Sequence, residues 1–147
     1  MTTTNLNRLE LDELRGKGQP KQHCKATFPL LGAHGTKETA TVYFEIAPGD
    51  NLGMHTDSAE ELLVILEGEA EVIIGDEKAK ADERTVALVP VMVPHDIINT
   101  GDETLKVLGI FGGANNIVAT FDYAWMPGEI SVIDTEEMTK AQQEQAV

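Results

Sequence analysis

The chain has 147 residues, a length that suits one globular domain with a sizeable buried core. Its 25 acidic and 11 basic residues give a formal net charge of −14, which disfavours nucleic acid and anionic membranes as partners. The single cysteine, Cys24, excludes an intramolecular disulfide and a zinc–thiolate cluster. We expect a cytoplasmic protein, because the N-terminus has no apolar signal-peptide core and no apolar stretch approaches the ~20 residues that span a bilayer.

Residues 1–25 are expected to form a polar N-terminal arm. Its leucines have the spacing of a short helix, and glycines and a proline interrupt that helix: Leu6, Leu9, Leu11 and Leu14, then Gly16, Gly18 and Pro20. His23 and Cys24 follow in a stretch with few structural signals, so we expect them at the surface. A nucleophilic role for Cys24 would need a base beside it, and the sequence offers none.

Residues 26–133 are predicted to form one all-β domain. Val42, Phe44 and Ile46 alternate with polar or aromatic neighbours, as in a half-buried strand. Further strands are expected within 60–68, 69–77, 78–82, 85–90, 94–103 and 104–113, with turns at Gly75-Asp76 and Gly101-Asp102. Several short strands at roughly ten-residue spacing favour a sandwich or a barrel.

Residues 134–147 are expected to be a C-terminal helix or tail. Asp134 or Thr135 is a suitable N-cap, and two glutamates follow in the first turn. Before this tail, Phe121, Tyr123 and Trp125 form an aromatic cluster that can pack over the barrel or over a partner subunit.

Four residues have the chemistry and spacing of a metal site. His55, Asp57 and Glu61 all have odd numbers, so on a continuous strand they would point to one face. His95 and Asn99 share a face in the same way on a later strand. Two imidazoles with one or two carboxylates can hold a first-row divalent metal and leave positions open for a small molecule.

Two sequence motifs give these residues a family context. The stretch 49–68 reads G-x5-H-x-D-x3-E-x6-G and resembles the first motif of the cupins, with Asp57 in place of the second His. The stretch 90–99 reads P-x-M-x2-H-x3-N and resembles their second motif, with Met92 and Arg84 in place of its two glycines. The resemblance implies a small single-domain (monocupin) protein of the cupin_2 type. It also implies a double-stranded β-helix, the cupin jelly-roll barrel, with short N- and C-terminal helical appendages, and a homodimer.

The same resemblance assigns the metal ligands as His55, Asp57, Glu61 and His95. His55, Glu61 and His95 would alone make a 2-His-1-carboxylate triad. Asp57 can bind directly, bind through a water or stay outside the coordination shell, and the sequence leaves these alternatives open. We expect a divalent transition metal as cofactor, Fe(II) before Mn, Ni or Zn, because imidazole and carboxylate ligands suit all four.

Four other residues are weaker candidates. Asn99 is expected to order the strand or turn beside the site by hydrogen bonding to the backbone. Met54 and Met92 lie next to the motifs, either as pocket walls or as core filling. Tyr43 is a weak catalytic candidate, since it can donate a proton if its side chain faces the pocket.

The sequence is compatible with three classes of function. The first is a metal-dependent enzyme acting on a small organic molecule, most simply an Fe(II)-type dioxygenase. The second is a non-redox lyase or isomerase in which the metal is a Lewis acid. The third is a metal- or small-molecule-binding protein without turnover. The resemblance decides the fold but leaves this choice open, because one fold supports many chemistries.

Overall fold

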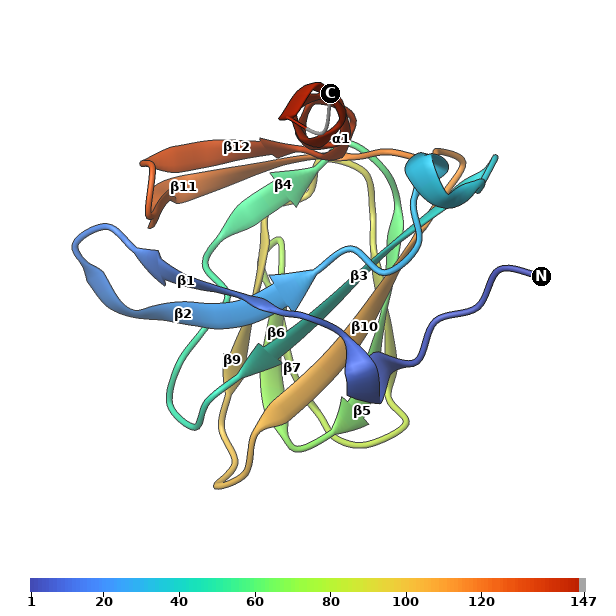
Figure 1. The fold of residues 1–147 in the computed structure, drawn as a ribbon. Coiled ribbons are helices and arrows are strands. Elements are labelled where there is room, and N and C mark those ends of the chain that lie inside the picture. The colour runs from blue at the N-terminus through green and yellow to red at the C-terminus, as the bar shows by residue number, and fades with distance from the viewer. Residues whose placement is uncertain (146–147) are drawn as a thin grey trace.

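The computed structural model describes residues 1–145, which form one curled antiparallel sheet with few helices (Figure 1). The strands are β1 (Asp12–Gly16), β2 (Gln19–Thr27), β3 (Thr39–Ile46), β4 (His55–Asp57), β5 (Glu61–Glu67), β6 (Ala70–Ile74), β7 (Glu77–Ala81), β8 (Val86–Val89), β9 (His95–Asn99), β10 (Leu105–Gly112), β11 (Val118–Met126) and β12 (Ile130–Asp134). The helices are the 3-10 turns η1 (Leu6–Arg8) and η2 (Gly32–His34) and the α-helix α1 (Thr135–Gln145). The predicted all-β jelly roll is confirmed.

The strand order shows how the sheet closes into a barrel. Neighbouring strands run β7-β6-β9-β4-β11-β1-β2-β3-β10-β5-β8, and β12 pairs with β11. One half of the barrel is therefore β3, β10, β5 and β8, and the half facing it is β7, β6, β9 and β4. The β11–β12 hairpin and α1 lie over one end of the barrel (Figure 1).

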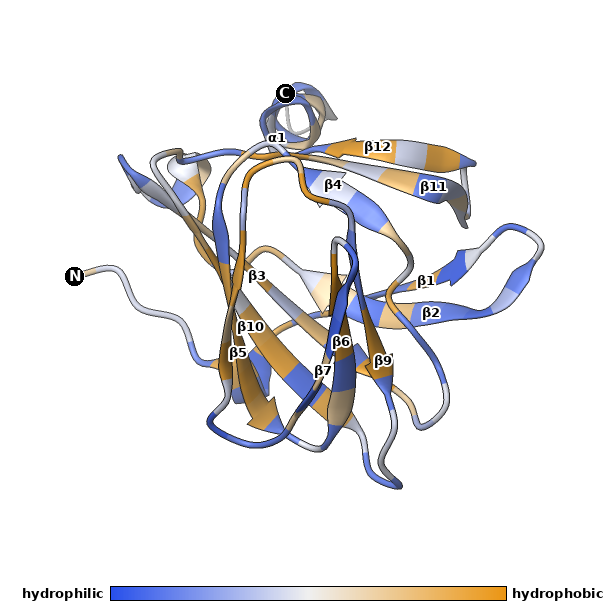
Figure 2. Ribbon diagram, turned by 180° about the vertical axis from the view of Figure 1, so that it is seen from behind, coloured by the Kyte–Doolittle hydropathy of each residue, from blue (hydrophilic) through white to orange (hydrophobic). Residues whose placement is uncertain are grey.

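Alternating apolar residues explain why the first half is well ordered. On β10, Leu105, Val107 and Phe111 are buried and alternate with half-exposed residues. This strand pairs with β3 from Leu105↔Ile46 to Gly112↔Thr39, and with β5 on its other side. Figure 2 shows the apolar bands on β3, β5 and β10 and the hydrophilic surface of β7. The inward-facing side chains of these strands supply much of the hydrophobic core.

The N-terminal segment differs from the expectation. The predicted helix over the leucines is wrong beyond the short turn η1, and most of the expected polar arm lies in the sheet as β1 and β2. These strands pair with each other and continue the sheet to β11 and β3. Only Gln22 and Cys24 are buried on β2, so the strand has little of the apolar alternation that reveals a strand in sequence.

The C-terminal helix forms as expected. The Asp134 side chain accepts hydrogen bonds from the backbone N–H groups of Glu136 and Glu137, so Asp134 is the N-cap. Thr135 is buried instead, and its hydroxyl donates to Asn116 Oδ1. Among residues 1–145, no helix has the length and apolar character needed to cross a membrane.

Two residues keep an unusual backbone conformation at turns before the strands. Arg84 and Met92 have φ angles of 74° and 61°, in the left-handed region that favours glycine. These are the positions at which the second sequence motif has its glycines. The backbone at both positions therefore has a conformation that glycine favours, in agreement with the glycines of the motif.

Candidate metal centre

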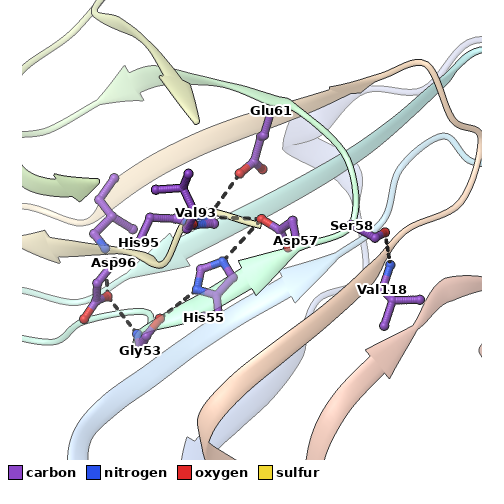
Figure 3. A network of polar contacts seen from close by, with 10 residues as sticks. Gly53, His55, Asp57, Ser58, Glu61, Val93, His95, Asp96 and Val118 are labelled. Atoms are coloured by element: carbon purple, nitrogen blue, oxygen red, sulfur yellow. Dashed lines mark hydrogen bonds and ion pairs between the residues drawn. The ribbon is translucent and has the colours of Figure 1, made fainter. Parts of the chain in front are cut away.

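The structure brings together the four predicted ligands from three strands (Figure 3). His55 and Asp57 lie on β4, Glu61 begins β5 and His95 begins β9. His55 and His95 are direct partners across the β4–β9 pair, so their side chains project to the same face. All four are 2–5% exposed, so the cluster is deeply buried.

Backbone carbonyls fix the orientation of both imidazoles. Nδ1 of His55 lies 2.7 Å from the Gly53 carbonyl oxygen, and Nδ1 of His95 lies 2.9 Å from that of Val93. A carbonyl only accepts, so each Nδ1 carries the proton and donates it. The Nε2 atoms are then the free ligand atoms, as in metal-binding histidines whose second nitrogen is held by a hydrogen bond.

Asp57 lies at the centre of the cluster. Its Oδ2 is 3.0 Å from His95 Nε2 and 3.6 Å from His55 Nε2, and the ligand atoms of these three residues all lie within 4.8 Å of one another. Glu61 is further out, with Oε1 3.5 Å from His95 Nε2. The carboxylate between the two imidazoles is therefore Asp57, and Glu61 is the fourth member.

Two buried atoms in this cluster have no hydrogen-bond partner. These are Asp57 Oδ2 and His95 Nε2, which are close together but not aligned for a hydrogen bond. Buried polar atoms are normally paired, and an orphaned pair of ligand atoms is what a cation would satisfy. The donor set of two imidazoles and two carboxylates therefore fits a divalent first-row transition metal.

The pKa values of His55, Glu61 and His95 are strongly shifted. Burial, and then the neighbouring His95, lower the pKa of His55 to about 4, so this imidazole is neutral. Burial also raises the pKa of Glu61, and Asp57 adds to the rise. For His95, burial lowers the pKa, but the Asp57 and Glu61 carboxylates close to its Nε2 outweigh burial and raise the pKa to about 10. When no metal ion is bound, a proton on His95 thus offsets the negative charge of the neighbouring carboxylates.

Gly109 makes room for the Glu61 side chain. A Cβ atom at Gly109, on the inward face of β10, would collide with Glu61 Oε2 and with Val42 Cγ1. The carboxylate therefore lies directly over the backbone of the neighbouring strand. Gly109 was not among the predicted site residues, because an isolated glycine within a strand also fits a bulge or a weak point in packing.

Asp96 supports the loop that holds His55. Its side chain accepts hydrogen bonds from the Gly53 N–H at 2.8 Å and from Asn51 Nδ2 at 3.0 Å. The Gly53 carbonyl in turn accepts from His55 Nδ1. Asp96 was not among the predicted site residues, and its position directly after His95 is the only signal that the sequence gives.

The cluster opens into a cavity of about 860 Å³ inside the barrel. Phe121 stacks on the His55 ring with centroids 4.4 Å apart, and Trp125 meets Phe121 edge to face at 5.3 Å. Cys24 also lines this cavity and is 2% exposed, so the expectation that it lies at the surface is wrong. Burial raises its pKa to about 12, so it stays a neutral thiol.

The aromatic cluster after β10 divides between interior and surface. Trp125 is 1% exposed and lines the cavity, so it offers no contact area to another subunit. Its side chain is buried because β11 pairs with β12 and β4 over this end of the barrel. Tyr123 is 52% exposed and is free to meet a partner.

The weaker candidates lie away from the cavity. Tyr43 is buried, but Val42 and Phe44 line the cavity, so Tyr43 points to the opposite face, where its hydroxyl donates to Glu45 Oε2 at 2.6 Å. Burial and then Glu45 raise its pKa. A catalytic role for Tyr43 in this cavity is therefore excluded by its direction.

Asn99, Met54 and Met92 do not line the cavity either. Asn99 Nδ2 donates to the carbonyls of Ile46 and Glu103, and Oδ1 accepts from the Gly101 N–H, so Asn99 orders the turn after β9. Met92 is 57% exposed on a surface turn, and Met54 is half-buried. Neither methionine lines the cavity.

Comparison with known proteins agrees with the all-β jelly-roll fold described above. Residues 42–111 match the Cupin_2 family model, described as a cupin domain. Auxin-binding protein 4 of Zea mays is 29% identical over 105 residues, which cover 65% of this chain. The match covers 52% of that relative, so the chain spans about half its length.

Solved structures share the fold at low sequence identity. The polyketide cyclase RemF of Streptomyces resistomycificus has a TM-score of 0.64 at 14% identity, over 92% of this chain and 85% of that one. Bacillus subtilis oxalate decarboxylase, described with Mn(II) centres, has a TM-score of 0.61 at 18% identity, over 68% and 28%. The cupin domain of Schizosaccharomyces pombe Cnp3 has a TM-score of 0.62 at 17% identity, over 76% and 73%.

Proposed function

Because this chain belongs to the cupin superfamily, we propose that its buried cluster holds a divalent transition metal and that the protein is a metal-dependent enzyme acting on a small organic molecule. The observation that carries the proposal is the convergence of two imidazole Nε2 atoms on the Asp57 carboxylate in the wall of a cavity. His55, Asp57 and His95 would hold the ion, with Glu61 as the fourth ligand. A bound metal would supply a Lewis acid and, if it is iron, one-electron chemistry with oxygen.

An Fe(II)-type dioxygenase is the first candidate. The support comes from the interior of the cavity, where apolar walls surround the cluster. Outside the cluster, Cys24 is the only buried titratable residue among the described residues that line it. The Cys24 thiol has a pKa too high for proton transfer near neutral pH. The walls would therefore orient a substrate and exclude water, and the metal with oxygen would supply the reactive chemistry of a dioxygenase.

A non-redox lyase or isomerase is the second candidate, and the place of Glu61 favours it. Within the cluster, the Glu61 carboxylate approaches His95 and stays outside the compact group formed by the other three residues. If three residues suffice to hold the ion, Glu61 remains free to move a proton to or from a substrate. Its raised pKa would suit that task. The alternative of a binding protein without turnover has the name of the maize relative as its support.

We also propose that the protein is a homodimer. Leu62, Val86 and Leu88 lie on adjacent strands β5 and β8, with Leu62 directly opposite Leu88, and are 42–57% exposed. β8 ends the strand order, so its outer edge has no partner strand among residues 1–145. An exposed apolar face beside an open edge fits a protein–protein contact.

Oxygen uptake tests the proposed reaction type. Protein reconstituted with Fe(II) should consume oxygen in step with loss of substrate from a panel of diketones, catechols and flavonols. The variant His55→Ala should lose this uptake, and His23→Gln, which alters a histidine paired with Asp50 outside the cluster, should retain it. Turnover without oxygen in protein loaded with Mn(II) or Zn(II) would favour the lyase or isomerase. Absence of stoichiometric metal after reconstitution would refute the metal enzyme altogether.

A further inference from the structure

The walls of the metal-site cavity are apolar over most of their area. Its buried charged groups are those of the cluster, and many of its other lining side chains are large and apolar: Phe44, Leu63, Phe111, Ile117, Phe121 and Trp125. At about 860 Å³ the cavity is at the upper end of the range for small-molecule sites. A ligand of one or two rings would fit with its body against these walls.

The cavity wall also offers little positive charge to an anion. Within the described residues, its histidines are His55 and His95 of the cluster and the exposed His34. Among residues 1–145, no Lys or Arg lines it, whereas four carboxylates do so at and near its mouth: Asp12, Glu13, Asp134 and Glu137. The cations near the mouth are engaged on the surface. Arg15 and Lys25 pair with Glu13, and Lys140 pairs with Glu137. A negatively charged group on a ligand, beyond one that binds the metal, would therefore have no Lys or Arg among the described residues to pair with inside the cavity.

The cluster itself adds to this charge selection. Two carboxylates, Asp57 and Glu61, already match the two positive charges of a divalent ion. Each anionic group that entered with a substrate would leave the buried site with excess negative charge, and a buried charge without a partner is strongly disfavoured.

From these observations, and resting on the proposed metal site, we propose that the substrate is uncharged in solution. It would have an apolar ring body and uncharged oxygen donors for the metal at one end, such as one hydroxyl or two adjacent hydroxyls. Phosphate esters and dicarboxylates would be excluded. Bacillus subtilis oxalate decarboxylase shares the fold, and its name states that it acts on oxalate, a small dianion. This chain would not accept such a substrate, because no Lys or Arg among residues 1–145 lines the cavity to pair with a dianion.

The chain offers a direct optical readout for the test. Trp125 is the only tryptophan in the sequence and lines the cavity, so a ligand that enters changes its fluorescence. Protein loaded with Zn(II) binds without redox turnover, so affinity is measured separately from any reaction. Three probes share one apolar body and differ in charge: 4-tert-butylcatechol, 4-tert-butylphthalate and 4-tert-butylphenyl phosphate. Isothermal titration calorimetry gives the affinities independently.

We expect the uncharged catechol to bind at least about tenfold more tightly than either dianion, which corresponds to a difference of about 1.4 kcal/mol. The variant Asp12→Lys places a cation at the exposed mouth. It should improve binding of the phosphate ester by about threefold at low salt, as expected for an exposed charge pair, and leave the catechol unchanged.

Two results would overturn the inference: dianions that bind as tightly as the catechol, or no binding of the catechol at all to the zinc-loaded protein. Zinc content, measured by mass spectrometry on the same sample, distinguishes this failure from failure of the proposed function. If zinc is bound stoichiometrically but charge selection is absent, only the substrate class is wrong. If zinc is not bound, the metal site and the substrate class fail together.

Discussion

The half of the barrel built from β3, β10 and β5 is paired over long stretches, whereas β4 and β9 face each other through one residue pair. The first half carries alternating apolar residues and can hold the fold by burial. The second half carries His55, Asp57 and His95 on short strands, each histidine held by a carbonyl two residues earlier. Ligand placement thus depends on local turns, and stability depends on the opposite sheet.

Glu61 is the exception that joins the two halves. It lies on β5, in the apolar half, and reaches the histidine of β9 across the barrel. The different roles of the two halves can therefore be tested by substitutions that affect metal binding, the free energy of unfolding or both.

The largest effect is expected from removing an imidazole. His55→Ala or His95→Ala should lower the affinity for Mn(II) or Zn(II) by more than about 100-fold, because each removes a ligand atom from the centre of the cluster. The far-UV circular dichroism spectrum should stay that of a β protein, since the long-paired half is unchanged. His23→Gln serves as the matched control and should bind metal normally. Unchanged metal affinity in either alanine variant would contradict the assignment.

The second effect is a dependence of metal affinity on pH. In the metal-free protein the pKa of His95 is raised to about 10, so the residue carries a proton at neutral pH that the metal must displace. The dissociation constant should therefore fall about tenfold for each pH unit between pH 7 and 9. Titration calorimetry in buffers of different ionisation enthalpy would show release of about one proton per ion. A flat profile would mean that His95 is neutral before the metal binds.

The convergence of the four side chains could be predicted from the sequence because the information is local. Odd-numbered spacing placed His55, Asp57 and Glu61 on one face, and the two motifs placed His95 in register with them. The central position of Asp57 was left open, because spacing gives the face of a strand but not how far each side chain reaches. Gly109 and Asp96 act through β10 and the Gly53 loop, and contacts between distant segments leave no periodic signal in one sequence.

The β1–β2 segment shows the same limit for the fold. Its leucines suggested a helix, yet pairing with β3 and β11 makes it part of the sheet. Such tertiary pairing overrides local propensity. Because only Gln22 and Cys24 are buried on β2, the sequence of this strand gives little sign of the pairing. By contrast, β10 was predicted because its inward residues are strongly apolar.

The third effect comes from filling the space beneath Glu61. Gly109→Ala should weaken metal binding by about tenfold, because the new methyl group displaces the Glu61 carboxylate. It should also lower the free energy of unfolding by about 1–3 kcal/mol, through the collision with Val42. Gly112→Ala is the matched control on the same strand, since a Cβ there meets nothing within 4 Å. Denaturant unfolding and metal titration of both variants measure the two effects; equal behaviour of the variants would remove Glu61 from the site.

The smallest effect concerns the two turns with left-handed backbone. Arg84→Gly and Met92→Gly should each raise the free energy of unfolding by about 0.5–1 kcal/mol, because glycine adopts positive φ without the steric cost of a side chain. Metal affinity should not change, since neither residue lines the cavity. Glu83→Gly, next to Arg84 but without positive φ, should be destabilising instead. Destabilisation by all three glycines would show that the turn geometry is not strained.

The most direct test of the account is anomalous scattering at the metal absorption edge from crystals of the reconstituted protein. We expect one ion inside the barrel, about 2.0–2.3 Å from Nε2 of both His55 and His95 and from a carboxylate oxygen of Asp57. An ion bound elsewhere, or imidazoles that turn away from each other with no ion between them, would contradict the central claim.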